Sequence, residues 1–267
     1  MPHDEAFSKV WKNRPSRFPS LGKGTRFMKI KMILCGALIA AGTARAELPP
    51  GTIRAIQATN QNSVLMLSGA LKFMCGRCNQ VHDTTVEGPV TVVDTNGLLL
   101  TSSSVVQISL LTRKIEIRES TLKVKLPNGT ELPVRVVLTD RDLDAVLLAP
   151  EKPSAVAAGT FKPVNWAATA KAHVLDDIVI VGRMDKNHNA LVETAPAKIN
   201  SVETKPRTVY GCAHLVSGDG EAVFNATGQL VGVGLGRQTI VAADELQDVI
   251  EQARHAAATA TTTKEAP

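Results

Sequence analysis

Residues 88–106 read GPVTVVDTNGLLLTSSSVV, and this stretch decides the fold class. Two runs of β-branched and apolar residues, Val90–Val93 and Leu98–Thr101, flank the turn Asp94–Gly97. The Asn-Gly pair in that turn accepts positive φ angles and is typical of tight hairpins. The stretch therefore predicts two short antiparallel strands, and the turn Pro127–Gly129 predicts a second hairpin of the same kind.

Short β-rich runs recur along both halves of the chain. They are Leu122–Lys125, Val134–Leu138, Ala145–Leu148, Ile178–Val181, Ala190–Val192, Ala197–Ile199, Ala222–Asn225 and Leu230–Val233. Only two helices are predicted, Thr52–Ala58 and Ala243–Ala258, the second from apolar residues at helical spacing. Many short strands with few helices favour an all-β fold of barrels or a sandwich.

The strand runs fall into two lobes, at about residues 52–155 and 160–242. The Ala-, Ser- and Gly-rich segment Pro153–Thr160 is predicted to link them. The helix over 243–258 then closes the domain 47–258, and the Ala- and Thr-rich tail 259–267 is expected to be disordered.

Residues 1–46 have the pattern of a secretory leader. Two lysines, Lys29 and Lys31, precede the apolar run Met32–Ala41, and Ala44-Arg-Ala46 is a small-x-small cleavage site. Met28 is a better start than Met1, because it places these lysines directly before the apolar run. We expect a secreted or periplasmic protein that begins at Glu47; an uncleaved signal peptide would be its one attachment to a membrane.

The charge of the chain depends on the leader. Residues 47–267 carry 21 Lys and Arg against 23 Asp and Glu, a net charge of −2. No basic stripe remains to neutralise phosphates, so nucleic-acid binding has no support.

Three stretches in fixed order resemble a known family. Gly88–Val106 is similar to a strand, a turn and a Thr-x-x-His-Val-Val segment, and Leu126–Leu147 resembles a hairpin that leads into Asp-Leu-Ala-Val-Leu. Ser217–Gly232 is similar to Gly-Asn-Ser-Gly-Gly-Pro-Val-Phe-Asn and the strand after it. These are features of trypsin-like serine proteases of the bacterial HtrA type, here without their C-terminal PDZ domain. The resemblance implies two six-stranded antiparallel β-barrels with a site in the cleft between them.

Carried over residue by residue, the catalytic triad is degenerate. The histidine position is Ser104, the aspartate position is Asp144 and the serine position is Asp219. The resemblance places the oxyanion loop at Ser217, Gly218 and Gly220. A serine nucleophile needs a proton-accepting base, which Ser104 cannot supply, and a carboxylate at 219 would repel the developing oxyanion.

These substitutions predict a protein that is not an enzyme and that needs no cofactor. We expect Asp144 to accept hydrogen bonds from Ser104 and from nearby backbone N–H groups. We expect an extended peptide or a protein partner to bind along the strands Val223–Asn225 and Leu230–Gly236, and a role as a scaffold subunit of an envelope complex fits equally well. An active serine-type endopeptidase or hydrolase with a rearranged site is the alternative. Its candidate residues are Ser217 as nucleophile and His188 or His214 as base.

Cysteines supply a second signal. In an oxidising compartment Cys75 and Cys78 favour a local disulfide, and Cys212 is left over as an odd thiol or an intermolecular bridge. The alternative is a metal site on Cys75, Cys78 and His82, although structural zinc takes four ligands. The chain would then be a small interaction module that depends on the disulfide or on the metal.

Overall fold

The computed structural model describes residues 48–75, 79–106, 115–213, 219–236 and 238–264, all within the compact unit Glu47–Pro267. Thirteen strands, two α-helices and two short 3₁₀ helices follow one another along these residues. They are α1 (Pro50–Asn60), β1 (Val64–Cys75), β2 (Gln80–Val92), β3 (Leu99–Ser102), β4 (Ile115–Ser120), β5 (Lys123–Lys125), β6 (Glu131–Asp140), β7 (Ala145–Pro150), η1 (Pro153–Ala155), β8 (Asp177–Arg183), η2 (Lys186–His188), β9 (Val192–Glu203), β10 (Val209–Cys212), β11 (Ala222–Asn225), β12 (Leu230–Gly236), β13 (Thr239–Ala242) and α2 (Gln247–Lys264).

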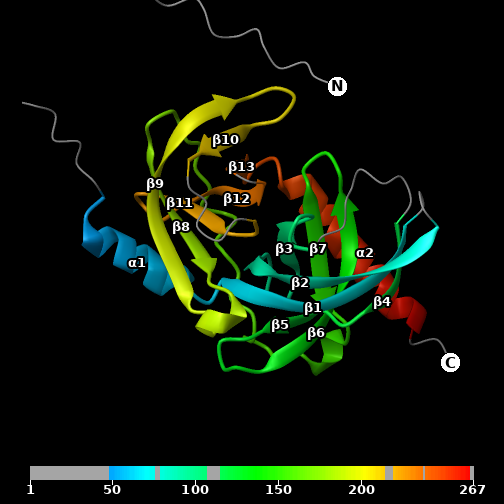
Figure 1. Cartoon of the computed structure of the whole chain (residues 1–267). Helices are drawn as coiled ribbons and strands as arrows, with labels where there is room; N and C mark the ends of the chain where they lie inside the picture. The colour runs from blue at the N-terminus through cyan, green and yellow to red at the C-terminus, as the bar shows by residue number, and fades with distance from the viewer. Residues whose placement is uncertain (1–47, 76–78, 107–114, 214–218, 237, 265–267) are drawn as a thin grey trace, which may run out of the picture. The chain divides into compact units, whose positions relative to one another are not determined.

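The first lobe is a barrel of β1, β2, β3, β7, β6 and β5, closed by the pairing of β1 with β2 (Figure 1). Every pairing in it is antiparallel, and β4 adds a short strand along the far half of β1. Leucine and valine fill the interior, as alternation along each strand requires; Leu65, Leu67 and Leu71 of β1 are all buried there.

The second lobe is a closed barrel in the order β10-β13-β12-β11-β8-β9. Its strands are also antiparallel, and its core contains Ile178, Ile180, Val223 and the ring of Tyr210. The prediction of an all-β fold with two six-stranded antiparallel barrels and a C-terminal helix is therefore confirmed. Both expected hairpin turns form, with positive φ at Gly97 and Gly129.

Several strands were not apparent in the sequence pattern, namely β1, β4, β10 and β13. In β1, Gly69 stands in the same row as the buried Leu65, Leu67 and Leu71; it has φ of 146°, and a Cβ there would lie 2.4 Å from the carbonyl oxygen of Thr121. Glycine weakens the apolar pattern of a strand, because it has no side chain to bury.

The strand predicted at Ala190–Val192 is wrong, since only Val192 is in a strand. Asn189 and Ala190 both adopt left-handed backbone angles, and the backbone carbonyl of Asp185 accepts from the N–H of Ala190 at 3.1 Å. The segment is the turn between β8 and β9 rather than a strand.

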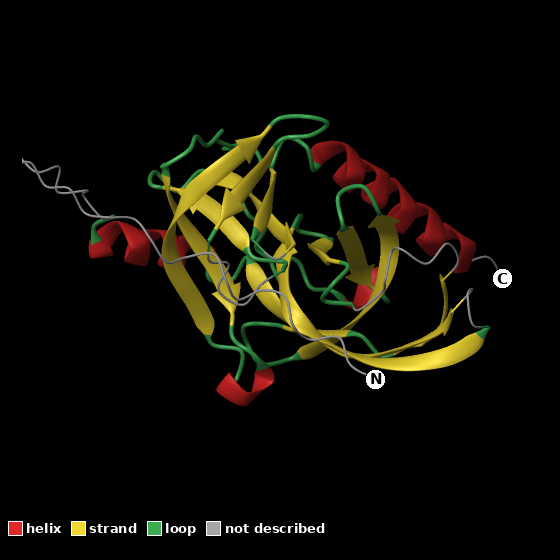
Figure 2. Ribbon diagram, turned by 45° about the horizontal axis from the view of Figure 1, so that its top comes forward, coloured by secondary structure: helices red, strands yellow, loops and turns green. Residues whose placement is uncertain are grey.

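The C-terminal helix differs from its prediction at both ends. It starts at Gln247, because Ala243 still pairs its N–H with Val231 of the second barrel, and it continues to Lys264. The extension takes in residues 259–264, which were expected to be disordered. The helix packs against β6 and β7 of the first barrel, and Figure 2 shows it outside the strands.

Helix α1 covers the second barrel, with Ile56 packed among residues of β8, β11 and β12. Among the described residues, no helix combines the length and the apolar character that a bilayer crossing requires. The two barrels meet where β3 ends and where β7 and β11 begin, and that junction holds the site positions taken from the sequence.

Candidate functional site

Three separate segments bring the triad positions together. Ser104 follows β3, Asp144 lies in the turn between β6 and β7, and Asp219 precedes β11. The first two segments adjoin because β3 pairs with β7, and the backbone N–H of Ser103 donates to the carbonyl of Asp144 at 3.0 Å. Asp144 has a positive φ of 57°, a conformation that a short polar side chain tolerates.

The central contact joins the two barrels. The hydroxyl Oγ of Ser104 donates a hydrogen bond to Oδ2 of Asp219, from a residue 115 positions away in the sequence. Asp219 is 8% exposed, whereas Ser104 is exposed. A carboxylate removed from water needs donors of this kind to remain ionised, so this bond holds the side chain of Asp219 in a defined place.

Ser104, the donor that we expected, is not one of the two serines that bond to Asp144. Ser103 Oγ donates to its Oδ1, and Ser102 Oγ lies 3.2 Å from its Oδ2. Ser104 is therefore not its donor, and the expectation of a Ser104–Asp144 bond is wrong. Ser102 and Ser103 are buried and were missed in the sequence, where the run of three serines after a strand was the available signal.

Ser102 links the two carboxylates indirectly. Its Oγ lies 3.1 Å from Ser104 Oγ and accepts a hydrogen bond from the backbone N–H of Ser104, also at 3.1 Å. Because the hydroxyl hydrogen of Ser104 is donated to Asp219, the one hydroxyl hydrogen of Ser102 has two acceptors within reach, Ser104 Oγ and Asp144 Oδ2. Three hydroxyl groups thus serve two carboxylates in one connected network.

Gly220, in the loop before β11, lies close against the backbone of the first barrel. Its φ is 99°, and a Cβ there would lie 2.0 Å from the carbonyl oxygen of Pro89. Its own carbonyl accepts from the buried hydroxyl of Thr91 at 2.9 Å, and its N–H donates to Gly234 at 2.6 Å. Only glycine fits this position, because any side chain would overlap the backbone of Pro89.

Of the residues next to Gly220 in the loop, the structure describes only some. Ser217 and Gly218 lie outside the described residues, and so does His214. Glu221 stands where the family has a second glycine and is fully buried, with its backbone carbonyl accepting from Gly234 at 2.9 Å.

The strands next to the site have less open edge for a bound peptide than we expected from the sequence. Strand β11 pairs with β8 on one side and with β12 on the other, so Val223–Asn225 has no open edge. Strand β12 pairs with β13 up to Gly236, but on its other side with β11 only up to Val233. Within the described part of the chain, the open edge is confined to Leu235 and Gly236, beyond the end of β11.

Two of the cysteines singled out in the sequence, Cys75 and Cys212, lie within the described residues. Cys75 ends β1, Cys78 lies outside the described residues, and the predicted disulfide between them stays a prediction. His82 stacks on Phe73 across the β1–β2 pair, with ring centroids 5.7 Å apart, and Cys212 is buried in the second barrel. No cluster of three or more His, Cys, Asp or Glu suited to a metal occurs among the described residues.

Two histidines outside the cleft have local carboxylate partners. His173 Nδ1 lies 3.4 Å from Asp176, and His188 Nδ1 lies 2.7 Å from Asp185, each three residues along the chain. His188 lowers the pKa of Asp185, first through this side-chain hydrogen bond. These pairs tie the two rings to exposed turns, not to Ser104.

A comparison with known protein families agrees with the fold. A family model described as the trypsin-like peptidase domain matches residues 88–233, more than half of the chain. The match runs from β2 to β12 and includes all three triad positions. A search of curated protein sequences found no match. The protein therefore belongs to the trypsin-like peptidase domain family.

Proposed function

We propose that this protein is a proteolytically inactive member of its family that binds an extended peptide or a protein partner outside the cytoplasm. The observation that carries the proposal is the hydrogen bond from Ser104 to Asp219. At the two positions where the family has a base and a nucleophile, this chain has a hydroxyl donor and a carboxylate acceptor that satisfy each other.

The chemistry of hydrolysis supports inactivity. Peptide hydrolysis by this fold needs a group that takes the proton of the attacking hydroxyl and later returns it to the leaving amine. A serine hydroxyl has no basicity for that step. A carboxylate beside the oxyanion position also opposes the negative charge that develops in the transition state.

A serine-directed fluorophosphonate probe tests the inactivity. We expect no labelling of the wild-type protein and none of the variant Ser217→Ala, with an active trypsin as the positive control. Labelling of the wild type that is lost in Ser217→Ala would establish the alternative, a hydrolase with a rearranged site. His214→Ala would then identify the base.

Binding rests on the strand edge at Leu235 and Gly236. In an edge interaction the main chain of a peptide supplies the hydrogen bonds, so the catalytic residues are not required. We expect affinity capture from an envelope extract to recover a partner with the wild type and to lose it with Gly236→Pro, which removes a backbone donor. Circular dichroism checks that the variant is folded; equal capture by both proteins would refute this edge as the binding site.

Export is part of the same proposal, because the leader pattern of residues 1–46 supports it. The expected result is a mature protein in the envelope or medium whose first residue is Glu47, as determined by N-terminal sequencing. A Cys75–Cys78 disulfide fits that compartment, and mass analysis after thiol alkylation with and without reduction tests it.

A further inference from the structure

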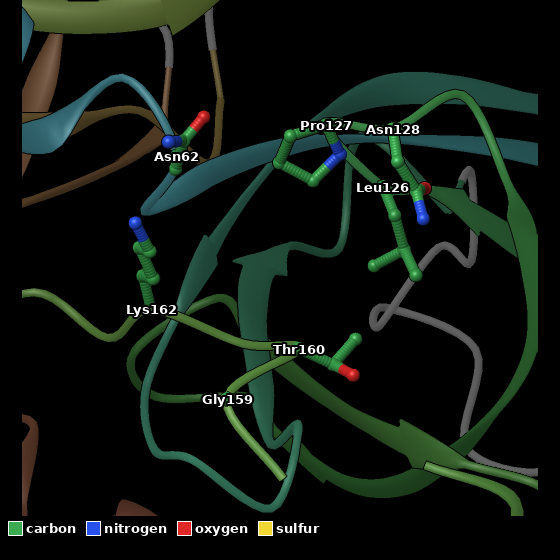
Figure 3. Close-up of a pocket in the computed structure, with 7 residues that line it drawn as sticks. All are labelled: Asn62, Leu126, Pro127, Asn128, Gly159, Thr160 and Lys162. Carbon is green, nitrogen blue, oxygen red and sulfur yellow. The ribbon is translucent and has the colours of Figure 1, made fainter. Parts of the chain in front are cut away.

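A hollow of about 360 Å³ lies between the two barrels, away from the degenerate triad. One wall is the turn between β5 and β6, and the opposite wall contains Arg183, Asn189 and Ala190. A second hollow of about 310 Å³ lies against the same turn and adds Lys162, shown with Asn62 and Thr160 in Figure 3. None of the described residues that line either hollow is acidic.

Arg183 is anchored by backbone carbonyl groups alone. Its Nε donates to the carbonyl of Val64 at 2.8 Å, its Nη1 to Ala190 at 2.9 Å, and its Nη2 to Gln61 at 2.6 Å. A guanidinium carries five N–H groups, so two remain beyond these bonds. Within the described part of the chain, no carboxylate lies within 4 Å of it.

Burial makes this cation costly. Loss of solvation lowers the pKa of Arg183, which means that the surroundings disfavour its charge. Carbonyl oxygens satisfy hydrogen-bond geometry but carry no net charge, so the positive charge stays uncompensated.

Lys125 repeats the arrangement from the other barrel. Its Nζ donates to the amide oxygen of Asn189 at 2.8 Å, directly beside the residue whose carbonyl Arg183 binds. Other lysines differ: Lys123, two positions earlier on β5, pairs with Glu131 at 3.1 Å. Two cations from different barrels therefore converge on Asn189 and Ala190, and both contact neutral oxygens.

We propose that this hollow binds a small oxyanion, a carboxylate or a phosphate group, held between Arg183 of β8 and Lys125 of β5. The oxygens would accept from the two remaining guanidinium N–H groups and from the ammonium group, in charge-assisted hydrogen bonds. Since the two residues belong to different barrels, a bound anion links the barrels and stabilises the folded protein.

Inorganic phosphate is the first probe. At constant ionic strength we expect the melting temperature to rise with phosphate in a saturable way, and calorimetric titration to give the affinity. Lys125→Ala should weaken binding about tenfold or more, because a charge-assisted contact is lost. Lys123→Ala is the matched control and should bind as the wild type does.

Two results would overturn the proposal: no saturable binding by the wild type to any oxyanion probe, or equal binding by Lys125→Ala and the wild type. The test remains informative if an Arg183 variant fails to fold, because the lysine variants do not remove a bond to the backbone. The ammonium group of Lys125 donates to the side-chain amide of Asn189, whereas Arg183 donates to three backbone carbonyl groups.

The source of the oxyanion is distinguished by a second pair of probes. N-acetylglycine presents the carboxylate of a chain end, and N-acetylglycinamide is the same molecule without the charge. Tighter binding of N-acetylglycine than of phosphate assigns the hollow to a peptide terminus, and the reverse order assigns it to free phosphate. Saturable binding of the acid and the amide with equal affinity would mean that charge is not what the hollow recognises, and would refute the proposal. These measurements do not depend on the catalytic state of the cleft.

Discussion

At the scale of single residues, the main feature of the candidate site is the hydrogen bond from the neutral hydroxyl of Ser104 to the carboxyl group of Asp219. In a catalytic triad a histidine ring takes up a proton and returns it, whereas Ser104 in this chain donates its hydroxyl hydrogen to the carboxylate of Asp219. The contribution of this pair to stability can be measured directly.

A double-mutant cycle on Ser104→Ala and Asp219→Asn measures that contribution. We expect Ser104→Ala to lower the free energy of unfolding by about 1–3 kcal/mol, because a buried carboxylate loses a donor. The coupling energy should be about 0.5–3 kcal/mol by urea unfolding at neutral pH. The exposed Ser201→Ala, paired with Asp219→Asn, is the control and should show no coupling; a coupling energy near zero for Ser104 would contradict the contact.

Tyr210 permits a second test at the residue scale, because it is the one tyrosine in the chain. It is 1% exposed, and burial raises the pKa of its phenol, with the charges of Asp244 and Glu245 acting in the same direction. The folded protein thus keeps this proton to higher pH than the unfolded chain.

The free energy of unfolding should accordingly contain a contribution from Tyr210 that is complete below pH of about 10 and is lost as pH rises from there towards the folded pKa. Tyrosinate absorbance during an alkaline titration reports the group directly. We expect its midpoint to lie higher in the native protein than in denaturant, and coincident midpoints would show that burial does not perturb the phenol.

At the scale of elements, the C-terminal helix has a role that its chain position conceals. It follows the second barrel but packs on the first, with Val249, Ile250 and Ala253 buried against leucines from both barrels. Arg254 extends the attachment through an ion pair with Asp94 of the β2–β3 turn, at 3.2 Å. The helix therefore packs on residues of both barrels and helps to hold them together.

Ile250→Ala tests whether this packing of the helix stabilises the domain. The side chain is 3% exposed, and its truncation should lower the free energy of unfolding by about 2–5 kcal/mol, because a cavity is left in the shared cluster. Gln252→Ala is the matched control on the exposed face of the same helix, with an expected change within about 0.5 kcal/mol. Equal effects in urea unfolding would mean that the helix is not packed there.

At the scale of the whole domain, the barrels share a core rather than a surface contact. Leu98, Leu100 and Leu147 of the first barrel lie in one buried cluster with Val233 and Leu235 of the second. Polar links reinforce it: the hydroxyl of Thr91 binds Gly220, and the guanidinium of Arg183 binds Val64.

Such a shared core predicts that the two barrels unfold together. Differential scanning calorimetry should show a single transition in which the calorimetric and van't Hoff enthalpies agree. Two resolved transitions, or a van't Hoff enthalpy well below the calorimetric one, would indicate that each barrel unfolds on its own.

The local sequence was sufficient for the hairpins and for the strand-rich class. The turns at Gly97 and Gly129 and the runs around them depend on backbone preference and on period-2 alternation, which neighbouring residues decide. The same information was insufficient for β1 and for the turn at Asn189 and Ala190. The close approach of Gly69 to Thr121 and the two left-handed residues depend on contacts that form only when distant strands approach.

The sequence alone determined which residue types stand at the site: a serine, an aspartate and a second aspartate at 104, 144 and 219. Only the tertiary structure decided how they pair, with Ser102 and Ser103 on Asp144 and with Ser104 on Asp219 across 115 residues. The physical reason is that residue type depends on the gene, whereas hydrogen-bond partners depend on how two closed barrels meet. The cations at Lys125 and Arg183 came together in the same way, and no local pattern marked them.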